Sequence, residues 1–138
     1  MLKTLFAGVI ALCLCTASPA AHAQAGSGNQ WILGAWRINV SIGDEGYVGI
    51  ANVFEVQEGR YEAHITLISA SSGTSATELA RVTVDGDAVI LDSYDIVQSN
   101  EPSGWDRDDF TLHRDGDDMS GTLQDEGGET GEDAHFFR

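Results

Sequence analysis

Residues 78–97 read ELARVTVDGDAVILDSYDIV, and this stretch decides how the chain folds. From Ala80 to Val84 apolar and polar side chains alternate, which is the pattern of a β-strand with one buried face. Asp85-Gly86 follows, a pair that favours a type I′ turn because such a turn needs positive φ at both central positions. The apolar residues from 88 to 97 then predict a second strand, so the segment is expected to form a β-hairpin.

The same pattern continues on both sides of this hairpin. Asp115-Gly116 repeats the turn signal, and no convincing amphipathic helix follows residue 30. Sequential antiparallel hairpins close most simply into an up-and-down barrel, which leaves no sheet edge exposed. We therefore expect an all-β fold, an eight-stranded antiparallel barrel, with a β-sandwich or jelly roll as the alternative. The predicted strands are residues 35–42, 47–57, 60–69, 78–84, 88–97, 109–114, 118–124 and 132–138.

The first predicted strand begins with a Gly-x-Trp motif, Gly34-Ala35-Trp36, and the last strand ends at Arg138. Together with the eight strands, these residues resemble the lipocalins and their wider calycin relatives, near the small, avidin-like end of the group. The resemblance implies a tryptophan that plugs the closed end of the barrel and a basic residue that packs across it. Gly34, Trp36 and Arg138 are accordingly expected to close the barrel, with a cation–π contact of about 1 kcal/mol.

Residues 1–23 have the three parts of a cleavable secretory signal peptide: a positive start, an apolar run and a small-residue cleavage site. The apolar run, residues 5–15, is too short to span a bilayer comfortably. We expect cleavage after Ala23, a flexible lead over residues 24–31, and a single barrel domain over residues 32–138. The protein is therefore expected to be periplasmic or secreted.

Cleavage would make the exported chain more acidic and free of cysteine. Cys13, Cys15 and the only lysine all lie in the expected signal peptide, and the full chain already has a formal charge of −15. A chain of this charge repels phosphate backbones, which argues against nucleic acid as a partner. Charged residues such as Arg37 and Glu62 lie on the predicted outward faces, so an outer-membrane barrel is not expected. No membrane span is expected after cleavage.

Two strand faces are predicted to point inward although they carry polar side chains. In the strand at 47–57 this face holds Asn52 and Phe54 together with Val48, Ile50 and Val56, and in the strand at 88–97 it holds Asp92 and Tyr94 together with Ala88, Ile90 and Ile96. A polar group inside a barrel costs a few kcal/mol unless it pairs with a ligand or with another buried group.

Five side chains are candidate ligand contacts. Four of them lie on predicted inward faces, and the fifth lies in the longest predicted loop, residues 98–108, where an aromatic side chain can act as a lid. Plain packing or an internal hydrogen bond is the alternative for each. The five candidates are Asn52, Phe54, Tyr61, Tyr94 and Trp105.

No catalytic residue, metal site or cofactor is predicted. The histidines lack metal-ligand spacing, and beyond residue 23 there is no Gly-x-Ser-x-Gly elbow, cysteine nucleophile or phosphate-binding glycine loop. Two acidic clusters resemble loose calcium ligands, but neither matches the EF-hand loop, and the second is better explained as a solvated hairpin turn. The clusters are Asp106, Asp108 and Asp109, and Asp115, Asp117 and Asp118.

Three functions are compatible with this sequence, because a fold alone does not fix function. A non-enzymatic barrel that binds a small, largely apolar ligand is the leading hypothesis. A packed barrel that acts as a protein-interaction or inhibitor module, with Trp105 in its contact surface, is the alternative. An enzyme that uses the barrel as a reaction chamber ranks last, with Asp92, Tyr94 or His135 as acid or base, because these residues form no convergent constellation.

Overall fold

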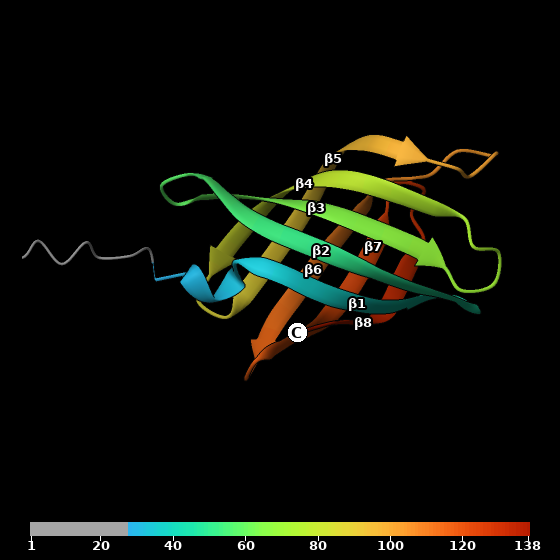
Figure 1. Ribbon diagram of the computed structural model, residues 1–138. Helices are drawn as coiled ribbons and strands as arrows, with labels where there is room; N and C mark the ends of the chain where they lie inside the picture. Colours follow the sequence, from blue (N-terminus) through green and yellow to red (C-terminus); the bar gives the residue numbers. More distant parts are fainter. Residues whose placement is uncertain (1–27) are drawn as a thin grey trace, which may run out of the picture.

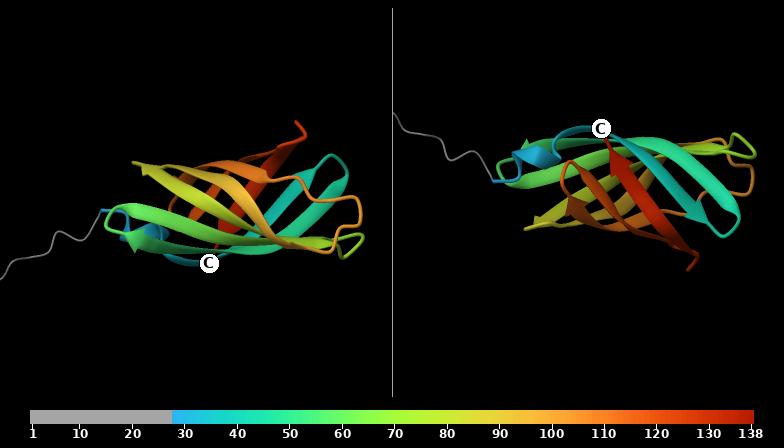
Figure 2. Two further views of the ribbon diagram at one scale, coloured as in Figure 1. Left: turned by 90° about the horizontal axis from the view of Figure 1, so that it is seen from above. Right: turned by 90° about the horizontal axis from the view of Figure 1, so that it is seen from below.

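The computed structural model describes residues 28–138, which form a closed barrel of eight antiparallel strands and confirm the predicted fold class (Figure 1). The expected signal peptide lies outside the described residues. Each strand pairs with the next, and β8 pairs with β1 to complete the barrel (Figure 2). The elements are η1 (Gln30–Ile32), β1 (Gly34–Ile42), β2 (Glu45–Gln57), β3 (Arg60–Ser69), β4 (Ser75–Asp85), β5 (Ala88–Ser99), β6 (Asp108–Asp115), β7 (Asp118–Asp125) and β8 (Thr130–Phe137).

The barrel has two different ends. The turns after β2, β4 and β6 lie at the end that also holds η1 and the C-terminus, and we call this the closed end. The connections after β1, β3, β5 and β7 lie at the opposite end, which we call the open end. The longest connection, residues 100–107, belongs to the open end.

Tryptophan and arginine side chains plug the closed end. Trp36 is 1% exposed, and its indole N–H donates a hydrogen bond to the Ile32 carbonyl oxygen at 2.8 Å. The Arg138 guanidinium lies over the Trp36 ring, 4.1 Å from its centroid, and donates to the Leu33 carbonyl oxygen at 3.0 Å. Trp36 and Arg138 are therefore in direct contact at the closed end. A Cβ at Gly34, whose φ is +101°, would lie 3.3 Å from the same guanidinium.

Trp31, in the segment before β1, contacts the barrel. Trp31 packs against the core, and the Arg114 guanidinium lies over its ring, 4.3 Å from the centroid. Within residues 28–138, no helix is long and apolar enough to cross a membrane.

Side chains fill the interior between the two ends. Phe110 and Phe136 are fully buried and meet edge to face, with their ring centroids 5.1 Å apart. They belong to one continuous core to which every strand contributes at least one buried side chain. An eight-stranded barrel is just wide enough for side chains to fill it, and most of this one is filled in that way.

The expected inward face of β2 is wrong by one residue. Val48, Ile50 and Asn52 are exposed on the outside, whereas Ala51 and Val53 are buried. Phe54 also lies on the outer face, where its ring stacks edge to face on His64 at 5.1 Å. The physical reason is interior volume. Small residues of β2 point inward opposite large ones of its neighbours: Ala51 pairs with Trp36 and Ile65, and Gly49 pairs with Ile38 and Leu67.

The expected inward face of β5 is wrong in the same way. Val89, Leu91 and Ser93 are buried, so Asp92 and Tyr94 lie on the outside. The Tyr94 ring packs under the Arg81 guanidinium at 5.0 Å, and its hydroxyl donates to Glu62 at 3.4 Å. Both faces of this strand carry apolar residues, so hydropathy alone does not set its orientation.

The pairing of β5 with β6 is short, and this shapes the open end. Only residues 88–91 of β5 pair with β6. Beyond them, side chains bridge the gap: Asp109 accepts a hydrogen bond from the Ser93 backbone N–H at 3.0 Å, and Arg107 donates to the Tyr94 carbonyl oxygen at 3.3 Å. The loop over residues 100–107 therefore starts from a part of β5 that no longer pairs with β6.

Candidate functional site

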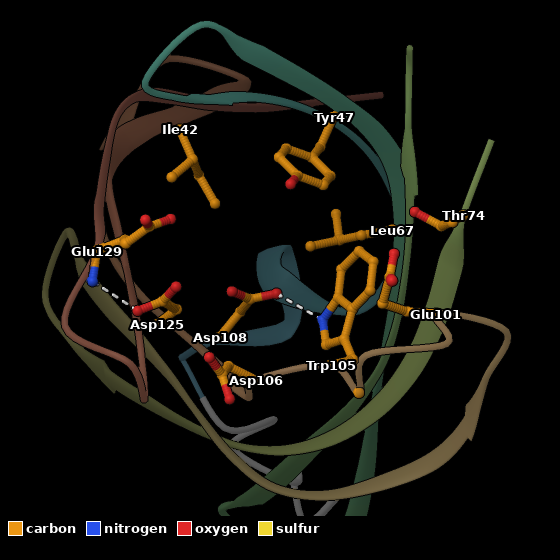
Figure 3. Close-up of a pocket in the computed structure, with 11 residues that line it drawn as sticks. Ile42, Tyr47, Leu67, Thr74, Glu101, Trp105, Asp106, Asp108, Asp125 and Glu129 are labelled. Carbon is orange, nitrogen blue, oxygen red and sulfur yellow. Dashed lines mark hydrogen bonds between the residues drawn. The ribbon is translucent and has the colours of Figure 1, made fainter. Parts of the chain in front are cut away.

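A pocket of about 220 Å³ opens at the open end of the barrel (Figure 3). One wall is apolar and aromatic and comes from β1, β2, β3 and the loop over residues 100–107: Ile42, Tyr47, Leu67 and Trp105. The other wall is acidic and comes from that same loop, β6, β7 and the connection between β7 and β8: Asp106, Asp108, Asp125 and Glu129. A fifth carboxyl group, Glu101, lies on the side of Trp105 and Thr74 (Figure 3).

Two carboxyl groups are buried together at this end of the barrel. Glu78 on β4 is 1% exposed, and Asp108, the first residue of β6, is 3% exposed. The Trp105 indole N–H donates to both, to Glu78 Oε1 at 2.9 Å and to Asp108 Oδ2 at 3.2 Å. The Asp108 backbone N–H donates to Glu78 Oε2 at 3.1 Å. The carboxyl pair thus fixes the tryptophan in the pocket wall.

Burial raises the pKa of both carboxyl groups. Desolvation is the largest cause for Asp108, followed by the charge of Glu78 and a hydrogen bond to it, and the pKa of Asp108 rises to about 8. Desolvation also raises the pKa of Glu78, against hydrogen bonds that lower it. Two adjacent carboxylates in a poorly solvated site cannot both ionise easily, so the pair holds a proton at neutral pH.

One polar group beside the pair is incompletely satisfied. Ser93 is 5% exposed and lies against Glu78, whose pKa it lowers. Its buried Oγ nevertheless makes no hydrogen bond of standard geometry. Most buried polar atoms in proteins do have such a partner, so this position is unusual.

The loop that carries Trp105 is anchored on both sides. The Trp105 indole ring contacts the Tyr47 ring edge to face, with the centroids 5.8 Å apart. Arg107 forms a two-pronged ion pair with Glu126, with its Nε donating at 3.0 Å and its Nη2 at 2.5 Å. The Glu126 backbone N–H donates to the Arg107 carbonyl oxygen at 2.9 Å. Trp105 therefore forms a supported wall of the pocket.

Of the five predicted ligand contacts, only Trp105 lines this pocket. Tyr61 points inward but borders a different hollow, beside the turns of the closed end. Asn52, Phe54 and Tyr94 lie on the outer surface, as described above. The structure does not bring these five residues together.

The acid and base candidates of the enzyme hypothesis are also apart from the pocket. Asp92 is on the outer surface, 3.7 Å from Arg81, and His135 is 3.4 Å from Asp118. Among the described residues, no three histidine, cysteine or acidic side chains come together in a way that could hold a metal ion.

Sequence reasoning missed Glu78 and Tyr47, and it named Asp108 only within an acidic cluster that resembles loose calcium ligands. Glu78 is in phase with Ala80 and Val82, and Asp108 is in phase with Phe110. Glu78 was the first residue of a predicted strand and Asp108 the last residue of the predicted loop, where a polar side chain is unremarkable. Following the alternation to the first residue of one strand, and one step beyond the start of the other, would have identified both as inward-facing carboxyl groups.

Comparison with known proteins supports the fold and gives no family. No protein-family model matches the chain, and no curated protein matches it. A de novo designed fluorescence-activating β-barrel is similar in structure, with a TM-score of 0.61 and 18% sequence identity over 79% of this chain and 94% of its own. The redesigned barrel mFAP0 bound to DFHBI has a TM-score of 0.62 and 17% identity over 79% of this chain and 100% of its own. A structure of mFAP2b bound to DFHBI has a TM-score of 0.63 and 15% identity over 80% of this chain and 95% of its own.

Proposed function

We propose that this protein is an exported, non-enzymatic barrel that binds a small ligand in the pocket at its open end. The observation that carries the proposal is the pocket itself, which has an aromatic wall and a buried carboxyl pair above an otherwise packed interior. Small-molecule sites are typically concave, largely apolar, and furnished with a few convergent polar groups. Two of the structurally similar designed barrels hold the small ligand DFHBI, which supports the same use of this architecture.

Two further features of the proposal come from the sequence. The pattern of residues 1–23 supports export to the periplasm or the medium. The stacking of Arg138 on Trp36 at the closed end supports a relationship to the calycins. In such a barrel the closed end provides stability and the open end provides specificity.

The filled interior limits the size of the ligand. A pocket of about 220 Å³ is smaller than the roughly 300–1,000 Å³ of typical drug-sized sites. The ligand is therefore expected to be no larger than a single substituted ring, held at the barrel mouth and not deep in the barrel.

The experiment is a titration of the purified protein with 2-phenylethanol and 2-phenylethylamine, followed by NMR. Binding should shift the indole N–H signal of Trp105 and leave those of Trp31 and Trp36, at the other end, unchanged. An Ile42→Trp variant, which fills the pocket, should abolish the shifts, whereas Ile90→Trp on the outer surface should not. The proposal fails if neither compound gives a saturable shift at Trp105.

The second candidate function is protein interaction, and one surface favours it. The outer faces of β2 and β3 expose Val48, Ile50 and Ile68 beside one another, at 48%, 54% and 41% exposure. An exposed apolar patch of this kind can mark a contact with another protein. Affinity capture with the wild type and with an Ile50→Asp variant tests it, because a genuine partner should be lost only from the variant.

A further inference from the structure

The lining of the open-end pocket is negatively charged without a compensating positive group. Among the described residues, five carboxyl groups line it, from the loop over residues 100–107, β6, β7 and the following connection, and no arginine, lysine or histidine does. The nearest arginine in sequence, Arg107, is held by Glu126 in the two-pronged ion pair described above. Any ligand in this pocket therefore meets a negative potential.

The same negative charges raise the pKa of two pocket residues. Desolvation raises the pKa of Tyr47, and the negative charges of Glu45, Asp108, Glu129 and Glu101 raise it further. The charge of Asp125 likewise contributes to the raised pKa of Asp108. Carboxyl groups from several different segments therefore affect the same two side chains, Tyr47 and Asp108.

The arrangement does not suit a bare metal ion. Among residues 28–138, no three acidic or histidine side chains converge closely enough to ligate one, whereas calcium takes six to eight oxygen ligands at about 2.3–2.6 Å. The carboxyl groups instead surround a space large enough for an organic group. The opposite wall offers the Tyr47 and Trp105 rings, set edge to face, and the side chains of Ile42 and Leu67.

We propose that the ligand is a small organic cation, an amine with one ring or a short aliphatic body. This inference rests on the proposed function and specifies its ligand. The ammonium group would lie toward Asp108, Asp125 and Glu129, and the carbon skeleton would pack against the wall that the Tyr47 and Trp105 rings form. Such a ligand is more polar than the largely apolar one that the sequence led us to expect.

Proton release is a consequence of this binding mode. In the free protein Asp108 faces Glu78 from β4, Trp105 from the loop and Asp125 from β7, and the pair holds a proton at neutral pH. A bound ammonium favours the ionised carboxylate. The amine should therefore bind more tightly as the pH rises from 6 to 8, and its binding should release protons that calorimetry in buffers of different ionisation enthalpy detects.

Three probes of similar shape and different charge test the inference. 2-Phenylethylamine is a cation, 2-phenylethanol is its neutral counterpart, and phenylacetate is an anion. At pH 7.5 and low salt, the amine should bind at least tenfold more tightly than the alcohol, and phenylacetate should not bind. Equal affinities for amine and alcohol would overturn the inference and leave the proposed function intact, whereas no binding of any probe would overturn both.

Matched charge variants locate the effect. The double variant Asp125→Asn, Glu129→Gln removes two pocket charges. The side-chain oxygen of an asparagine at position 125 can still accept the hydrogen bond from the backbone N–H of residue 129. Amine affinity should fall at least tenfold, and alcohol affinity should stay within twofold. The control is Glu58→Gln with Asp117→Asn, which removes equal charge at the closed end and should leave both affinities unchanged. If both double variants weakened amine binding equally, the attraction would belong to the whole molecule and the proposed pocket would be wrong.

Discussion

At the scale of single residues, the buried carboxyl of Asp108 makes folding stability depend on pH. Its pKa is 3.8 in a solvated chain and about 8 in the folded protein. The folded state therefore keeps a proton that the unfolded state releases between these values. The contribution of Asp108 to the free energy of unfolding is fully present below about pH 4. It falls as the pH rises toward 8, by up to about 1.4 kcal/mol per pH unit.

An Asp108→Asn variant should lose most of this dependence. The amide cannot ionise, its Oδ1 can still accept from Trp105, and its Nδ2 can donate to Glu78 in place of the shared proton. We expect urea unfolding at pH 5 and pH 8 to give a smaller difference in the free energy of unfolding than in the wild type, with the variant more stable at pH 8. Asp109→Asn, one residue along and outward-facing, is the control, and an unchanged pH slope in Asp108→Asn would contradict the account.

The same two carboxyl groups show where sequence reasoning about the site stopped. Alternation places Glu78 and Asp108 inward, but the phase of a strand is least certain at its ends, where both lie. Trp105 was identified because an aromatic residue in a long loop is conspicuous. Trp105 donates a hydrogen bond to Asp108, three residues along the chain, and another to Glu78, 27 residues away. Only the closed barrel brings Glu78 into contact with Trp105.

Arg138 is a second residue whose contribution can be isolated. Its guanidinium stacks on Trp36 and donates to the Trp31 and Leu33 carbonyl oxygens, so it joins the end of β8 to the segment before β1. Arg138→Ala should cost about 1–2 kcal/mol of unfolding free energy, and Arg138→Lys should recover only part of it because lysine lacks the planar fork. Arg60→Ala, which removes an exposed ion pair with Glu62 at 3.7 Å, should cost almost nothing. Equal losses at both positions would contradict a specific role in closure.

At the scale of strands, two glycines allow neighbouring backbones to approach closely. A Cβ on Gly121 of β7 would lie 2.0 Å from the Thr111 carbonyl oxygen, and one on Gly49 of β2 would lie 2.1 Å from the Thr66 carbonyl oxygen. Both glycines lie on inward faces, where such close approach lets a strand bend around a small barrel.

Gly121→Ala should therefore destabilise the barrel although alanine is the smallest possible change. The clash is with backbone, which cannot move aside without shifting β6, and the expected loss is about 1–3 kcal/mol. Gly46→Ala in β2 is the matched control, because its Cβ would meet nothing closer than the Ala70 Cβ at 3.9 Å. Thermal unfolding of both variants gives the comparison, and a Gly121→Ala protein as stable as Gly46→Ala would show that the strands can relax.

Strand number, order and turns were predictable from the sequence, whereas the faces of β2 and β5 were not. The hairpins lie where Asp85-Gly86 and Asp115-Gly116 predict them, but the expected type I′ turn is wrong: the loop residues are Gly86-Asp87 and Gly116-Asp117, and only the glycine of each pair has positive φ. Face selection in β2 depends instead on its neighbours. Hydropathy favours valine or isoleucine inside, but the small residues Ala51 and Gly49 lie opposite the large side chains of Trp36 and Leu67. Interior volume is a property of the closed barrel and not of a single strand.

At the scale of the whole molecule, excess negative charge opposes folding. The formal charge is −15, and the ion pairs among the described residues are few and largely exposed. Self-repulsion of this kind destabilises a compact state, and salt screens it over a Debye length of about 10 Å at 0.1 M. The melting temperature should therefore rise by a few degrees between 0.01 and 0.5 M NaCl, as a gain of about 1 kcal/mol would produce in a domain of this size.

Added salt should weaken amine binding while it raises the melting temperature. The two opposite responses distinguish repulsion within the protein from attraction between the pocket and the ligand. Screening removes repulsion between distant surface carboxylates, which stabilises the fold, but it also weakens the attraction between the pocket and a cation. If both effects come from charge, KCl at equal ionic strength should reproduce them, and the Glu58→Gln, Asp117→Asn control should show a smaller rise in melting temperature with unchanged amine affinity. A melting temperature that falls with salt would mean that the exposed ion pairs outweigh the net repulsion, and stability would then have to be attributed to pairs such as Arg107–Glu126.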